Sequence, residues 1–101
     1  MSESKSLLRP VYEEHLNSIF HLPVSETEAI ELELVGVEAT DAPPGHESFS
    51  LIFRAPLNMT PSQGLYRLQH EKLGTSDLLL VPIKADQDGL YFEAVFNRIL
   101  E

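Results

Sequence analysis

The sequence predicts a small all-β protein: an antiparallel sandwich or barrel of about six strands, preceded by one short N-terminal helix. Three observations favour this fold class. Apolar and polar residues alternate over most of the chain after residue 18, and segments rich in glycine and proline interrupt the alternation at short intervals. A helical pattern occurs only near the N-terminus. Together they indicate hairpins rather than βαβ units.

Length and composition favour one folded domain. The chain has 101 residues, of which 43% are hydrophobic, and this is enough apolar material for a single packed core. Residues 1–9 are polar apart from Leu7 and Leu8. We therefore expect residues 1–9 to form a flexible N-terminal arm and residues 10–101 to form a single β-domain.

The charge and the residue types limit the partners that can be expected. With 16 acidic against 7 basic residues, the net charge is -9, which disfavours nucleic acid and anionic lipid surfaces as partners. Without cysteine there are no disulfides or thiolate sites. No leader pattern or membrane-spanning apolar run is present, so we expect no membrane insertion and a protein that is cytoplasmic as synthesised. Signal-independent export, or incorporation into an extracellular assembly, stays open.

The helix is expected from Pro10 to Leu16, because proline suits the first helical position and Asn17 tolerates the left-handed conformation that ends helices. After it, the apolar residues alternate with period two. Six strands are expected, over residues 19–24, 29–39, 47–56, 65–70, 78–83 and 90–100. Gly36 lies where the alternation changes parity and predicts a bulge.

Turn chemistry accounts for the connections between these strands. Residues 56–64, with two prolines and a glycine, predict a loop that crosses from one part of the sheet to another. The segment KADQDG ends in Asp-Gly, which predicts a tight hairpin. Pro82 cannot donate to a ladder, so it indicates an edge or a bulge in the strand LLLVPI.

The sequence contains no catalytic motif, so we predict no catalytic residue, no cofactor and no metal site. Histidines occur at positions 15, 21, 46 and 70, in a spacing that matches no metal-ligand pattern. No serine lies in a nucleophile elbow, and a hidden triad built on Ser50 and His70 is much less favoured than serines on the outer face of a strand.

Arg54 is a long cation at the end of the strand ESFSLIFRAP, in an acidic protein. We expect it to form an ion pair with a carboxylate on a neighbouring strand, and the same applies to Arg67. The strand-borne candidates for Arg54 are Glu31, Glu33 and Glu93.

Two groups of residues are candidates for function. The strand LLLVPI is apolar on both faces, which indicates a strand covered on both sides or an interface strand. The candidate interaction residues are Leu7, Leu8, Leu79, Val81 and Ile83. The candidate polar site consists of Arg54, Tyr66 and His70, which would have to converge in one pocket.

Four blocks of the sequence resemble a family of small bacterial domains that has no established activity. The blocks are FSLIFRAP, QGLYRLQHEKLG, LLLVPI and YFEAVFN, and the likeness runs from about Tyr12 to Asn97. The residues that carry the likeness are Phe49, Leu51, Phe53, Arg54, Pro56, Gly64, Tyr66, Leu68, His70, Leu73, Gly74, Pro82 and Asn97. The sequence departs from the pattern at Asn17 and Ala55, where the family often has glycine. The resemblance implies an all-β domain, often encoded near phage-tail-collar proteins.

Three functions remain as hypotheses from the sequence. The first is a non-enzymatic protein-interaction or structural subunit, of a fibre or phage-tail-like bacterial assembly, whose arm adds to a sheet edge of a neighbouring copy. The second is a small-ligand-binding or hydrolytic barrel that uses Arg54, Tyr66 and His70. The third is an acidic inhibitory or immunity-like protein, whose face of Glu26, Glu28, Glu31 and Glu33 docks a basic partner.

Overall fold

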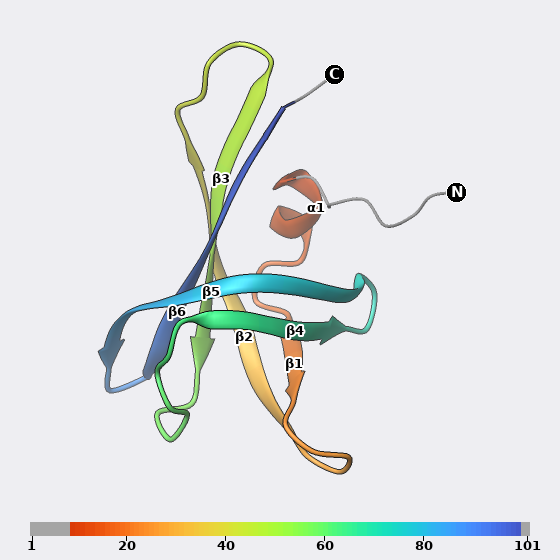
Figure 1. The fold of residues 1–101 in the computed structure, drawn as a ribbon, viewed down its shortest axis with the longest axis vertical. Coiled ribbons are helices and arrows are strands. Elements are labelled where there is room, and N and C mark those ends of the chain that lie inside the picture. Colours follow the sequence, from red (N-terminus) through yellow and green to blue (C-terminus); the bar gives the residue numbers. More distant parts are fainter. Residues whose placement is uncertain (1–8, 100–101) are drawn as a thin grey trace.

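The computed structural model describes residues 9–99, and within them six antiparallel strands close into a barrel beside one short helix (Figure 1). The elements are α1 (Arg9–Glu14), β1 (Ile19–Pro23), β2 (Ala29–Thr40), β3 (His46–Ala55), β4 (Gly64–His70), β5 (Gly74–Asp86) and β6 (Gly89–Ile99). The strand order is β1-β2-β3-β6-β5-β4, and β1 pairs with β4 to close the ring. The predicted fold class is confirmed, and of its two architectures the structure is the barrel.

The barrel has a long side and a short side. Strands β3 and β6 pair over their full length, from His46–Ile99 to Ala55–Leu90, whereas β5 pairs with only the first part of β6. In Figure 1 the pair β4 and β5 crosses the long strands, and α1 lies beside the part of β3 and β6 that extends past this crossing. The predicted crossing loop is confirmed, because residues 56–63 carry the chain from β3 to β4, which is not its neighbour in the sheet.

The core follows from the alternation in β3. Phe49, Leu51 and Phe53 are completely buried, as period two requires of residues on the inner face. Phe53 packs edge-to-face against Phe20 of β1, with ring centroids 5.1 Å apart. Helix α1 adds one large side chain, Tyr12, whose ring lies 6.1 Å from that of Phe49. The helix therefore covers the inner face of the sheet where β4 and β5 no longer do.

Three backbone irregularities lie where the sequence predicts them. Asn17 has a φ of 70° and ends the turn that follows α1, although α1 itself ends at Glu14 rather than at the predicted Leu16. The β2–β3 register shifts between Leu34 and Gly36, and the β5–β6 register shifts between Pro82 and Lys84, which confirms a bulge at both places. These bulges let long strands change direction while their inner faces stay on the core.

The boundaries of β5 and of the hairpin turn after it differ from the prediction, and β5 also ends later, at Asp86 rather than at Ile83. Strand β5 begins at Gly74 rather than at Leu78, because the turn after β4 needs only residues 71–73 and the polar segment that follows pairs with β4. In the β5–β6 hairpin the turn residues are Gln87 and Asp88, and Gly89 is already the first residue of β6. The Asp86 carboxylate accepts the backbone N–H of Asp88 at 2.8 Å, which stabilises a turn one residue earlier than predicted.

Candidate functional site

An open groove with a volume of about 530 Å³ lies on the outer surface, where β2 and β3 separate. It is lined by Ile19, Ala29, Ile30, Glu31, Glu33, Arg54, Ala55, Pro56, Asn58 and Asp88. These residues come from β1, β2, the end of β3 with the loop after it, and the β5–β6 turn. The groove is therefore where four parts of the chain meet.

The groove exists because β3 ends earlier than its neighbour. The β2–β3 register begins at the pair Glu33–Arg54, and two residues after Arg54 the chain reaches Pro56, which cannot donate to a ladder. Strand β2 continues on the other side, paired with β1 down to Ala29–Pro23. Figure 1 shows the β1–β2 hairpin and the loop after β3 leaving the sheet in different directions.

The predicted ion pair of Arg54 is confirmed, and its partner is Glu33 on the neighbouring strand. The Arg54 guanidinium donates to Glu33 Oε1. The two residues are opposite each other on β2 and β3, and both line the groove. On its other side Arg54 faces Tyr91 of β6. A hydrogen bond with Tyr91 and the charge of Glu33 raise the pKa of Arg54 above its ordinary value. Arg54 is thus charged and already held by a carboxylate of this chain.

Tyr66 and His70 do not lie in the groove with Arg54. The Tyr66 hydroxyl donates to the backbone carbonyl of Ser62 at 2.6 Å, and the Tyr66 ring packs 6.1 Å from that of Phe92. His70 is buried at the end of β4, against the segment that follows α1. The structure does not bring the three side chains of the candidate polar site together.

His70 connects the end of β4 to the segment after α1. Its Nδ1 accepts the backbone N–H groups of Lys72 (3.0 Å) and Leu73 (3.1 Å), so this nitrogen carries no proton. Its Nε2 therefore carries the proton and donates to Ser18 Oγ at 2.9 Å, while the Ser18 hydroxyl donates to the carbonyl of His15 at 2.5 Å. Both ring nitrogens are occupied, and neither is bonded to Ser50.

Burial is the main cause that lowers the pKa of His70 below its ordinary value, and the nearby His15 ring lowers it further. Glu71 opposes this shift, whereas His21 and Lys72 add to it. Because the folded pKa lies below the unfolded one, the unfolded chain binds the proton first as the pH falls. The stability that neutral His70 provides is complete above about pH 6.5 and is lost as the pH falls below it.

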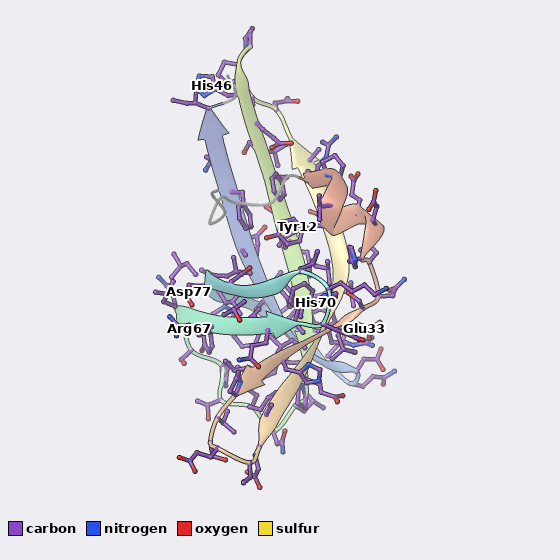
Figure 2. The ribbon with its side chains drawn as sticks, turned by 90° about the vertical axis from the view of Figure 1, so that its right-hand side faces the viewer. Tyr12, Glu33, His46, Arg67, His70 and Asp77 are labelled. Carbon is purple, nitrogen blue, oxygen red and sulfur yellow. The ribbon has the colours of Figure 1, made fainter. Side chains whose placement is uncertain are left out.

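We therefore expect the free energy of unfolding to fall as the pH is lowered from 7.5 toward 5, and part of this slope to disappear in the His70→Gln variant. Urea denaturation at a series of pH values measures the slope. His46→Gln is the matched control, because His46 is the exposed first residue of β3, far from His70 in Figure 2. Equal slopes for the wild type and the His70→Gln variant would contradict the assignment.

The outer face of β4 and β5 carries a second group of exposed side chains. Arg67 and Asp77 are cross-strand partners joined by two hydrogen bonds, of 2.9 and 3.2 Å, and are seen together in Figure 2. The Arg67 guanidinium holds the pKa of Asp77 below its ordinary value. Beside them, Leu65 and Leu79 form the next outward pair, with 72% and 53% of each residue exposed.

The candidate interaction residues of β5 lie on this same strand. Leu79 and Ile83 are exposed and Val81 is half-buried, while Leu78 and Leu80 point into the core. Within residues 9–99 the outer face of LLLVPI is therefore not covered, which leaves the interface interpretation of this strand. Leu7 and Leu8 lie outside the described residues.

The residues of these two surfaces that sequence reasoning missed include Asn58, Asp88 and Leu65. Asp88 and Asn58 reach the groove from loops, whose approach to β2 depends on the tertiary fold and leaves no pattern in the sequence. Leu65 did leave a signal, since it is the apolar member of the otherwise polar face of LYRLQH, with Arg67 and Gln69.

The described residues show neither a spanning helix nor a metal cluster. Over residues 9–99, no helix combines the length and the apolarity needed to cross a membrane. In the same part of the chain, no three metal-ligating side chains gather at one place.

Comparison with known proteins gives one match. A family model described as a domain of unknown function, DUF6916, matches residues 10–96. The chain belongs to the DUF6916 family. The DUF6916 match begins in α1 and ends in β6, so it includes β1 to β5 and most of β6. No curated protein and no solved structure matches the chain.

Proposed function

We propose that this DUF6916 domain is a non-enzymatic protein-interaction or structural subunit that acts through the outer face of β4 and β5. The observation that carries the proposal is the exposed pair Leu65 and Leu79, which lie directly opposite each other on neighbouring strands. Together with Val81 and Ile83 they form an apolar strip, here called the β4–β5 strip. Burying these side chains against a partner contributes less than the about 1.5 to 3 kcal/mol of a fully exposed side chain, because each is already partly buried.

The partner that suits the β4–β5 strip is a second copy of this chain. The strip lies next to a cation and an anion, Arg67 and Asp77. They form the next outward-facing cross-strand pair after Leu65 and Leu79. In a two-fold contact, each copy presents the same patch to the other, so leucine meets leucine and Arg67 of one copy can reach Asp77 of the other. The patch is therefore self-complementary in its apolar side chains and in its charges, as an isologous interface requires.

The wider context that we propose is a fibre or phage-tail-like bacterial assembly. It is supported by the resemblance to domains encoded near tail-collar proteins and by a barrel with apolar residues on its outer strands. The arm that carries Leu7 and Leu8 would provide a second contact between copies. The ligand-binding alternative receives less support, because Arg54, Tyr66 and His70 occupy different places in the structure.

The test is the molar mass of the purified chain, measured by size-exclusion chromatography with light scattering over a range of concentrations. We expect self-association that the Leu79→Glu substitution weakens by more than about tenfold, because it places a charge in an apolar contact. Association should also strengthen with salt, since each copy has a net charge of -9 and salt screens their repulsion.

Val24→Glu is the matched control, because Val24 is exposed to nearly the same extent (52%) but follows β1 in the β1–β2 turn. It should leave the association unchanged. Folding of each variant is checked by far-ultraviolet circular dichroism. A monomer at all concentrations, or equal loss of association in both variants, would contradict the proposal.

A further inference from the structure

Among residues 9–99, no strand lies beside one edge of β2 along the groove. Residues 29–32 pair with β1 on one side, but the pairing with β3 begins only at Glu33. Backbone groups of consecutive residues in a strand point alternately to the two neighbours. Within the described part of the chain, the groups of residues 29–32 that point toward β3 therefore have no strand partner and face the groove.

The lining of the groove carries a net negative charge. Three carboxylates line it, those of Glu31, Glu33 and Asp88, together with one guanidinium, that of Arg54. The charge of Arg54 is matched by Glu33, as the ion pair shows. Glu31 lies 3.8 Å from the His21 ring, and Asp88 lies in the exposed β5–β6 turn. The groove thus presents two carboxylates in excess of its own cation.

Apart from Asn58, the other residues that line the groove are apolar and lie beside the charged ones. Ile30 comes from β2, while Ala55 and Pro56 come from the end of β3 and the residue after it. A groove that combines apolar side chains, an excess of carboxylates and a free strand edge is complementary to an extended segment whose side chains alternate between basic and apolar.

We propose that the groove binds an extended basic segment of a partner protein, which adds to β2 as a strand beside residues 29–32. The segment occupies the place that β3 leaves when it ends at Ala55. Its basic side chains lie on the outer face, next to Glu31 and Asp88, and its apolar side chains lie over Ile30 and Pro56. This goes beyond the proposed function, because it concerns another face of the barrel and a partner of opposite charge.

Only about four residues of the partner can pair directly, because the open part of β2 covers residues 29–32. Electrostatic complementarity therefore has to provide much of the affinity and nearly all of the preference for basic segments. A consequence is that binding weakens as salt is added. Self-association through the β4–β5 strip is expected to respond to salt in the opposite direction, so each proposal can fail without the other.

The experiment uses two synthetic peptides with blocked ends, Lys-Val-Lys-Val-Lys and Glu-Val-Glu-Val-Glu, each labelled for fluorescence anisotropy and titrated with the full chain at low ionic strength. We expect the basic peptide to bind and the acidic one not to. Glu31→Gln and Asp88→Asn should each weaken binding by about two- to fivefold, as single exposed charge pairs do. Glu38→Gln is the control, because Glu38 is an exposed acid of β2 beyond the groove.

Strand addition has a signature that simple charge attraction lacks. Amide hydrogen exchange measured with the basic peptide present should show protection of those amides in residues 29–32 that point away from β1. The same amides should exchange at the unliganded rate with the acidic peptide. Binding that responds equally to Glu38→Gln, or that leaves these amides unprotected, or absence of binding by the basic peptide, would overturn the proposal.

Discussion

Replacing Phe53 with alanine is expected to lower the free energy of unfolding by about 4 kcal/mol, because deletion of a fully buried aromatic ring loses its burial and leaves a cavity. Phe53 is completely buried and packs edge-to-face against Phe20 at 5.1 Å. It joins β3, at the centre of the long side, to β1, next to the closure with β4. Urea denaturation followed by circular dichroism measures the change.

The same deletion on the outer surface gives the comparison. Val95→Ala removes apolar atoms from a residue of β6 that is mostly exposed, and it should change the stability by less than about 0.5 kcal/mol. Phe53→Leu, which keeps most of the volume, should cost less than Phe53→Ala. A loss below about 2 kcal/mol for Phe53→Ala would show that the barrel interior collapses around the cavity, against the tight packing described above.

The elements could be predicted because each is specified by residues close together in the sequence. Alternation sets the inner face of a strand, and the side chains of Phe49, Leu51 and Phe53 cannot all reach the core in any other conformation. Asn17 and Pro82 act through their own backbone, so the helix end and the bulge near Pro82 were also predictable.

The arrangement of the strands could not be predicted in the same way. A sandwich and a barrel have the same alternation, and the choice depends on whether β1 reaches β4, which it does at the pair His21–Gln69. Nothing local to either residue specifies that contact. The start of β5 at Gly74 was missed for a similar reason, since its polar first residues are strand only through pairing with β4.

The candidate site could likewise be predicted only in part from the sequence. Arg54 was expected to pair with a carboxylate because it lies on a strand of an acidic protein, and Glu33 was one of three candidates. Only the register of β2 against β3 decides that Glu33 is the residue opposite Arg54. The groove depends in part on the early end of β3 at Ala55, which Pro56 indicates in the sequence. It also depends on the approach of Asp88, from a turn more than thirty positions further along the chain, and no sequence pattern indicates that approach.

The substitution Gly89→Ala is expected to lower the free energy of unfolding by about 3 kcal/mol or more, since it combines an unfavourable backbone angle with a collision. Gly89 has a φ of 156°, and a Cβ there would lie 2.5 Å from the backbone oxygen of Ala55 and 2.9 Å from Arg54 Cγ. The oxygen belongs to the β3–β6 ladder, so it cannot move without opening the pairing of Ala55 with Leu90.

Gly45→Ala separates the two contributions, because Gly45 has a φ of 84° and no atom within 4 Å of an added Cβ. It should therefore cost only the backbone term, about 1 to 2 kcal/mol. Denaturation curves of both variants under identical conditions give the difference in the free energy of unfolding. Equal losses would show that the close approach of β6 to Ala55 does not contribute to the loss of stability.

Gly89→Ala should in addition weaken binding of the basic peptide, because the collision also involves Arg54, whereas Gly45→Ala should not. Gly89 thus links the stability of the hairpin to the shape of the groove.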